Sequence, residues 1–178
     1  MLVTCLRIQG LKIVVPRIFC DSRGFFLESY RRPLYADSGI ALEFVQDNLS
    51  FSHQNVLRGL HYQSGQDKLI SVICGKIWDV AVDLRPSSIT FGQYEAVELD
   101  DRTRNQFFVP DGFAHGFYVL SQTALVQYKV SAVHDPAQER AIRWNDPELN
   151  IPWPCTEPTL SLRDQNSSFF KQIFEVVG

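Results

Sequence analysis

The chain has 178 residues, 45% of them hydrophobic and 21% charged, an ordinary balance for one globular domain with a sizeable core. Its formal net charge of −3 excludes a strong overall attraction to nucleic acid or to an anionic membrane. The longest apolar runs are too short to span a bilayer, and the N-terminus lacks a secretory signal pattern. Four scattered cysteines without a CxxC pair predict reduced thiols, so we expect a cytoplasmic protein.

In chain order, the apolar N-terminal run 1–15 is typical of a first strand, and RRPLYADSG (31–39) predicts a short helix. Runs rich in β-branched and aromatic residues then follow, separated by turn signals, at 69–73, 77–84, 94–99, 106–110, 116–120 and 124–132. A spacing close to ten residues is typical of a sandwich or a barrel, so the chain is predicted to be an all-β single domain over residues 1–178.

Two of these runs make more detailed predictions. Alternation in IWDVAVDL (77–84) places Asp79 on one face of the strand and Val80 on the other. Cys74 lies in the preceding apolar run and reads as a core residue.

The C-terminal part is predicted to differ from the strand region. The proline-rich segment 151–161 is expected to run along the surface in extended form. The segment 166–177 predicts a C-terminal helix with Asn166 or Ser167 as its cap.

The segment 44–69 carries the strongest chemical signal, because strand-like apolar residues surround a cluster of polar side chains. These side chains are Gln46, Asp47, Asn48, Arg58, His61 and Lys68. A histidine can take a proton near neutral pH, and a fixed cation can hold the anion that proton loss creates. An arginine suits a phosphate group. The combination indicates proton abstraction from a phosphorylated or nucleotide-linked substrate.

His61 and His115 each allow more than one interpretation. A histidine in a strand is more often structural than catalytic, but the nearby Arg58 and Lys68 favour a functional role for His61. His115 follows a turn that could aim it into a barrel mouth. The two histidines could instead be metal ligands, as in many jelly rolls. Such sites usually place a second histidine two residues after the first, where this chain has Gln63, so we expect no metal.

Tyr128 and Asp164 are further candidates with structural alternatives. On alternation, Tyr128 shares a face with Ala124 and Val126, so its hydroxyl faces an interior and needs a partner. That partner could be solvent, a backbone carbonyl or a substrate carbon awaiting a proton. Asp164 could be a carboxylate at a helix N-terminus, or it could orient an imidazole as carboxylates do for catalytic bases.

Eight motifs in order resemble those of the dTDP-4-dehydrorhamnose 3,5-epimerases over roughly residues 7–170. They are DSRGFFLESY (21–30), FVQDNLSFS (44–52), VLRGLHYQ (56–63), DVAVDLRPSSITFG (79–92), VPDGFAHGF (109–117), YKVSA (128–132), WNDPELNIPWP (144–154) and LSLRD (160–164). The resemblance implies a cupin-type jelly roll, a homodimer and no cofactor. It also implies inversion of C3 and C5, the carbons that flank the ketone of dTDP-4-dehydro-6-deoxy-D-glucose.

The same resemblance assigns the catalytic roles. His61 is the base, Asp164 supports it, Tyr128 is the acid, and Lys68 stabilises the enolate oxygen.

The family positions that contact the nucleotide sugar correspond to Arg23, Glu28, Gln46, Asp47, Asn48, Arg58, His115, Glu139 and Arg163. Arg58 and Arg163 are the predicted diphosphate ligands, and the family often has lysine in place of Arg163. By the same resemblance, we expect the N-terminal arm, about residues 1–35, to contribute to the dimer, with Arg23 and Glu28 helping to complete the neighbouring subunit's site.

One position departs from the family. His134 stands where the family usually has a second tyrosine that stacks on thymine. An imidazole can stack on a base, but it offers less area than a phenol.

Three alternatives to a 3,5-epimerase remain at this point. The nearest is a monofunctional 3- or 5-epimerase on a related nucleotide-linked 4-keto-6-deoxy sugar. A metal-dependent cupin oxygenase would use His61 and His115 as ligands. A non-catalytic sugar-binding jelly roll is disfavoured, because His61, Lys68, Tyr128 and Asp164 are present together.

Overall fold

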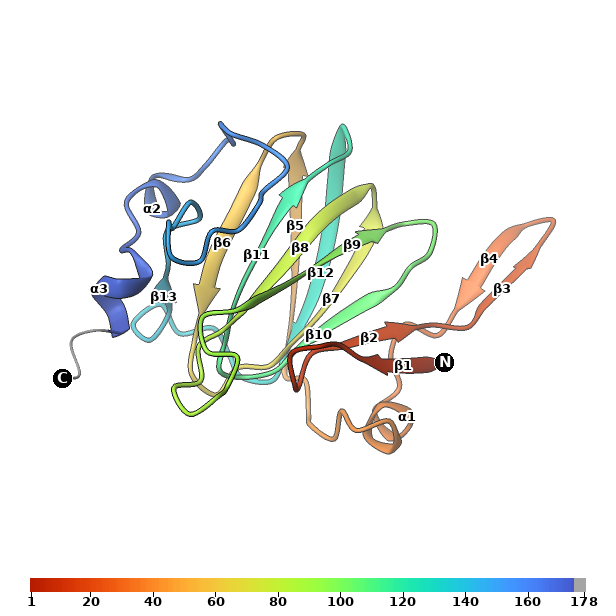
Figure 1. Cartoon of the computed structure of the whole chain (residues 1–178). Coiled ribbons are helices and arrows are strands. Elements are labelled where there is room, and N and C mark those ends of the chain that lie inside the picture. Colours follow the sequence, from red (N-terminus) through yellow and green to blue (C-terminus); the bar gives the residue numbers. More distant parts are fainter. Residues whose placement is uncertain (175–178) are drawn as a thin grey trace.

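The computed structural model describes residues 1–174, and two antiparallel sheets that face each other dominate it (Figure 1). The six-stranded sheet has the order β1 (Leu2–Cys5), β2 (Lys12–Val15), β10 (Gln106–Val109), β7 (Lys68–Cys74), β12 (Thr123–Val130) and β5 (Gln46–His53). The five-stranded sheet has the order β13 (Arg140–Ala141), β6 (Leu57–Tyr62), β11 (Phe113–Val119), β8 (Lys76–Asp83) and β9 (Tyr94–Asp100). This arrangement confirms the predicted all-β jelly roll with short helices.

The strand predictions are confirmed, with one refinement at the N-terminus. Each of the six predicted runs is a strand whose observed ends differ from the expected ones by a few residues. The N-terminal run forms two paired strands, β1 and β2, because the chain turns back at residues 7–10. A separate hairpin of β3 (Ile18–Asp21) and β4 (Gly24–Leu27) projects from the body of the molecule (Figure 1).

The core has two main layers because β8 buries both of its faces. Ile77 and Ala81 pack between the two sheets, and Val80 and Val82 pack on the opposite side. Residues of the C-terminal part cover that second apolar face, and Trp153 there is 8% exposed. The expectation that segment 151–161 runs along the surface is therefore wrong for its first residues, because an apolar sheet face must be covered.

The helices are short, and two expectations about the C-terminal one are corrected. The predicted N-terminal helix is present as α1 (Arg32–Asp37). Near the C-terminus, α2 (Leu162–Gln165) precedes α3 (Phe170–Phe174), and the rest of the predicted helix up to residue 177 lies outside the described residues. Asn166 is the C-cap of α2, and Ser167 donates to the carbonyl oxygen of Arg163, so neither residue caps α3. The backbone N–H of Phe170 is instead satisfied by Asp146 Oδ2 at 2.6 Å.

Two smaller observations complete the fold. Cys74, expected in the core, is exposed at the end of β7 where the chain turns into β8, and all four cysteines are free. In residues 1–174, no helix has both the length and the apolar character that a membrane crossing requires.

Gly59 lets the strands β6 and β11 approach closely. Its φ of +126° is a conformation that side chains disfavour. A Cβ atom there would lie 2.5 Å from the Cα of Gly116 and 2.9 Å from the carbonyl oxygen of His115. The close approach matters because His61 on β6 pairs directly with His115 on β11.

We predict that Gly59→Ala destabilises the fold by at least about 2 kcal/mol, since strain at positive φ adds to steric overlap with backbone. Gly65→Ala is the matched control, because Gly65 has a φ of +76° but no atom within 4 Å of the added Cβ. It should cost only about 1 kcal/mol, the usual cost of a Cβ in the left-handed conformation. Urea unfolding measures both free energies, and equal losses would contradict the close-approach argument.

Candidate active site

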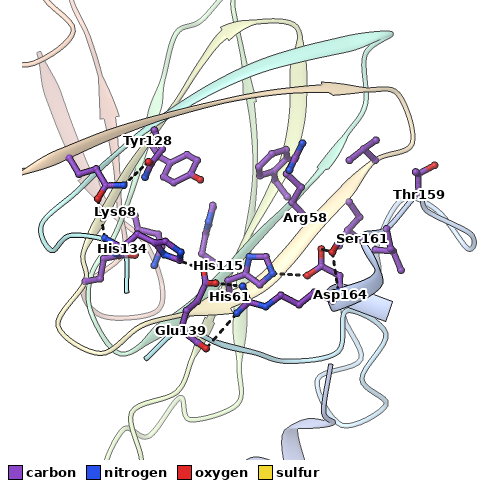
Figure 2. A pocket seen from close by; sticks show the side chains of 18 residues that line it. Arg58, His61, Lys68, His115, Tyr128, His134, Glu139, Thr159, Ser161 and Asp164 are labelled. Carbon is purple, nitrogen blue, oxygen red and sulfur yellow. Dashed lines mark hydrogen bonds and ion pairs between the residues drawn. The ribbon is translucent and has the colours of Figure 1, made fainter. Parts of the chain in front are cut away.

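A cavity of about 580 Å³ opens between the two sheets, and most of the predicted site residues line it (Figure 2). Its lining consists of Gln46, Asn48, Val56, Leu57, Arg58, His61, Gln66, Lys68, His115, Phe117, Tyr128, His134, Glu139, Thr159, Leu160, Ser161, Arg163 and Asp164. The two sheets contribute different chemistry. Lys68 and Tyr128 come from the six-stranded sheet, and His61 and His115 come from the five-stranded sheet.

Strand register explains which polar residues of the six-stranded sheet reach the cavity. Tyr128 pairs with Asn48, and Val130 pairs with Gln46 on one side and Lys68 on the other. Alternation then places Tyr128 and Asn48 on the cavity face. Asp47 lies on the outer face, where Lys129 Nζ donates to its Oδ1 at 2.7 Å. Asp47 is therefore outside the cavity.

His61 and Asp164 form a hydrogen-bonded pair at one wall of the cavity. His61 Nε2 lies 2.6 Å from Asp164 Oδ1, and the carboxylate side chain is only 4% exposed. Burial raises the pKa of Asp164, but hydrogen bonds from His61 and Ser161 outweigh it and hold this pKa below the usual value. An ionised carboxylate only accepts, so Nε2 carries the proton. Nδ1 is then the basic nitrogen of the neutral His61 ring.

A second histidine–carboxylate pair lies beside the first. His115 pairs with His61 across the strands, and its Nε2 lies 2.6 Å from Asp79 Oδ1. Asp79 is fully buried, and its Oδ2 has no hydrogen-bond partner among the described residues. Burial raises the pKa of Asp79, and His115 opposes this shift. The pair fixes the His115 ring against the cavity.

Lys68 presents a buried ammonium group to the cavity. Within residues 1–174, it makes no hydrogen bond and no ion pair. Burial lowers the pKa of Lys68 to about 8, and the charges of Glu139, Asp111 and Asp67 oppose that shift. The ammonium is available to an anionic oxygen of a bound molecule.

Tyr128 lies opposite His61 in the cavity (Figure 2). Its ring packs against the core between the sheets, and its hydroxyl has no hydrogen-bond partner within the described part of the chain. Burial raises the pKa of Tyr128; Arg58 lowers it and Glu139 raises it further. The phenol therefore stays protonated at neutral pH, which suits a proton donor.

Charged groups gather at the rim of the cavity. Arg163 Nη1 donates to Glu139 Oε2, and His134 Nδ1 lies 3.9 Å from the other oxygen of Glu139. Arg58 Nε donates to Ser52 Oγ at 2.9 Å. Two guanidinium groups beside a buried ammonium suit a ligand with phosphate groups.

Two predicted contacts lie elsewhere in the chain. Arg23 belongs to the turn of the projecting hairpin and pairs with Asp21 at 2.6 Å. Glu28 follows the hairpin and pairs with Arg31 at 2.7 Å. Neither lines the cavity of its own chain.

Sequence reasoning missed several lining residues, including Gln66, Thr159 and Ser161. Ser161 had a readable signal, because a serine three residues before an acidic residue is typical of a helix start. Within residues 1–174, no three His, Cys, Asp or Glu side chains gather in a group that could hold a metal ion.

Comparisons with known proteins agree on one family. The sequence model described as dTDP-4-dehydrorhamnose 3,5-epimerase matches residues 5–172. The dTDP-4-dehydrorhamnose 3,5-epimerase of Pseudomonas aeruginosa is 46% identical over 171 residues, which cover 94% of each chain. The dTDP-4-dehydrorhamnose 3-epimerase of Streptomyces niveus is 39% identical over 166 residues, covering 91% of this chain and 80% of the relative.

A solved structure is similar over nearly the whole chain. It is the dTDP-6-deoxy-D-glucose-3,5-epimerase of Legionella pneumophila in complex with dTDP-4-keto-L-rhamnose. The two chains share 46% identity with a TM-score of 0.94, covering 98% of this chain and 95% of the other. With sequence and fold in agreement, this chain belongs to the dTDP-4-dehydrorhamnose 3,5-epimerase family.

Proposed function

We propose that the chain inverts C3 and C5 of dTDP-4-dehydro-6-deoxy-D-glucose to give dTDP-4-dehydro-L-rhamnose. The observation that carries the proposal is the position of two groups. A His61–Asp164 pair on one sheet and a protonated Tyr128 on the other line the same cavity. Inversion at carbon needs a base on one side of the sugar ring and an acid on the other. The reaction as proposed needs no cofactor.

The proposed chemistry is one proton exchange, carried out at each centre. The Nδ1 atom of His61 takes the proton from the carbon next to the ketone, and the electron pair of the broken C–H bond spreads onto the ketone oxygen. Asp164 stabilises the imidazolium that forms. The Tyr128 hydroxyl then gives its proton to the same carbon from the opposite face, and the ketone re-forms. Solvent returns the proton to Tyr128 and removes one from His61.

Lys68 is proposed to stabilise the enolate oxygen. Its ammonium has no competing partner within the described part of the chain and lies in a buried wall, where a fixed charge acts strongly. His115, held by Asp79, faces the same cavity and is proposed to contact the sugar.

The nucleotide part of the substrate is proposed to lie along the rim. Arg58 and Arg163 bind the diphosphate, and Gln46, Asn48 and Glu139 provide further polar contacts. His134, with a side chain 44% exposed, stacks on the base in place of the family tyrosine. We also propose that the protein acts in the cytoplasm.

A single-centre epimerase is the second candidate. The 39% identical relative from Streptomyces niveus is a 3-epimerase, so membership of the family alone does not fix the number of centres. The one-centre and two-centre reactions need the same base and acid. They differ in how many carbons exchange hydrogen with solvent.

Hydrogen exchange with solvent tests the role of His61 as the base. In deuterated water, the wild-type protein should exchange hydrogen for deuterium at both C3 and C5 of dTDP-4-dehydro-6-deoxy-D-glucose, as followed by NMR. His61→Ala should reduce this exchange at least about 100-fold, because general-base catalysis contributes at least that factor. Exchange at one carbon only would establish the single-centre reaction, and unchanged exchange in His61→Ala would remove it as the base.

The acid has a different expected signature. Tyr128→Phe keeps the ring and removes the hydroxyl, so substrate binding should be nearly unchanged while formation of the epimerised product falls at least about 100-fold. Deuterium wash-in without inversion should persist, since His61 can return a proton to the face it came from. Wild-type turnover of Tyr128→Phe would refute its role as the proton donor.

The pH dependence follows from Lys68. The pKa of Lys68 is lowered to about 8, so its positive charge is present below that pH and lost as pH rises through it. We expect kcat/KM to fall above about pH 8, because kcat/KM reports the titrating groups of the free protein. Glu139 contributes most among the charges that raise this pKa, so Glu139→Gln should move the fall to lower pH. A profile that stays flat up to pH 10 would exclude a required Lys68 ammonium.

We further propose a homodimer in which the N-terminal arm completes the neighbouring site. The projecting hairpin exposes Phe25 by 53% and Phe26 by 68%, and the outer face of β5 exposes Leu49 by 64%. An isolated two-stranded hairpin is marginally stable, and exposed apolar patches mark contact surfaces. A second copy would cover both and bring Arg23 and Glu28 to the partner's cavity.

Complementation in trans tests this arrangement. Arg23→Ala and His61→Ala should each form a dimer of twice the 20.4-kDa chain mass. Each variant should be inactive when it is the only chain present. Mixed dimers should regain activity, because the Arg23→Ala subunit keeps its own His61 and receives Arg23 from its partner. Light scattering checks the mass. A monomer, or mixtures without activity, would contradict the shared site.

A further inference from the structure

Ser161 makes two hydrogen bonds to one residue at the start of α2. Its Oγ accepts the backbone N–H of Asp164 at 3.1 Å and caps the helix. The same hydroxyl donates to Asp164 Oδ2 at 2.9 Å. Ser161 therefore holds both the backbone and the carboxylate of the residue that contacts His61.

The carboxylate of Asp164 consequently has one side-chain donor on each oxygen. His61 Nε2 contacts Oδ1 at 2.6 Å, and Ser161 contacts Oδ2. In the neighbouring pair, Asp79 contacts His115 through Oδ1 while its Oδ2 has no hydrogen-bond partner within the described residues. A carboxylate held at both oxygens cannot rotate without losing a bond, and a buried orphan oxygen is costly.

We propose that Ser161 is a positioning residue for the epimerase reaction. It fixes the Asp164 carboxylate so that Oδ1 points to Nε2 of His61 and keeps Nδ1 as the base. The inference rests on the proposed roles of His61 and Asp164. The Ser161 hydrogen bond also lowers the pKa of Asp164, which helps to keep the carboxylate ionised.

The competing explanation is that Ser161 only caps α2, and side-chain choice separates the two roles. Threonine keeps both the cap and the donated hydrogen bond. Glycine is accepted at an N-cap at a cost of only a few tenths of a kcal/mol, but it cannot donate to Oδ2. Alanine loses both. Ser167→Ala is the matched control, because Ser167 donates to the carbonyl oxygen of Arg163 at 3.0 Å and has no bond to Asp164.

The experiment measures kcat and KM for the four variants, with thermal unfolding as a check of folding. Ser161→Gly and Ser161→Ala should lose about 10-fold to 100-fold in kcat at unchanged KM, as expected for a hydrogen bond to a charged group. Ser161→Thr and Ser167→Ala should stay within about 3-fold of wild type. Equal losses in the glycine and alanine variants would support a donor role beyond the cap.

Three results would overturn the inference. Wild-type kcat in Ser161→Gly would reduce Ser161 to a cap. A raised KM at unchanged kcat would make it a substrate contact. A matching loss in Ser167→Ala would indicate general loosening of α2. None of these touches the proposed function, which fails separately if His61→Ala retains exchange.

Discussion

The hydrogen bond between His61 and Asp164 joins residues 103 positions apart in the chain, and the site depends on it. It requires α2 to lie against β6, so the C-terminal part must pack on the five-stranded sheet. That packing is driven by the second apolar face of β8, which Trp153 and Phe170 help to cover. Burial of the apolar face of β8 therefore helps to hold Asp164 against His61, and that contact sets the tautomer of the histidine.

Most charged side chains that line the cavity have a hydrogen-bond or ion-pair partner within the described residues, and Lys68 does not. Asp164 and Asp79 each hold a histidine, and Glu139 holds Arg163. The ammonium of Lys68 has neither a hydrogen bond nor an ion pair in the described part of the chain. Keeping an ammonium buried and unpaired costs folding free energy, and the lowered pKa of Lys68 expresses this cost. Such a cost is understandable at the place where the proposed enolate anion forms.

Much of the fold could be predicted from sequence because its signals are local. Alternation in 77–84 and 124–132 identified strands and the inward side of Tyr128, and the structure agrees. The short helix α2 and the burial of residues such as Trp153 were harder to predict from sequence. Their conformation depends on which sheet face needs covering, and that is a property of residues far away in the chain.

The candidate site was predicted from sequence motifs, and the structure adds the contacts of each residue and the strand face on which it lies. Spacing alone left Asp164 as either a helix-start carboxylate or a partner of an imidazole, and in the structure it is both. Asp47 matched a motif yet lies on the outer face, because the period of two in a strand divides neighbours between faces. Arg23 and Glu28 lie outside the cavity of their own chain, so a single chain does not test the role predicted for them in a neighbouring subunit's site.

Because the proposed base His61 and the proposed acid Tyr128 stand on different sheets, the packing of the core sets the distance across which a sugar ring must fit. Side chains such as Phe107 and Val119, both fully buried between the layers, act as spacers for that distance. Proteins of this kind could drift from two inverted carbons to one by repacking such spacers, with every reacting group unchanged. The volume of these buried side chains would then decide how many carbons are inverted. A comparison restricted to the residues that line the cavity would miss such changes.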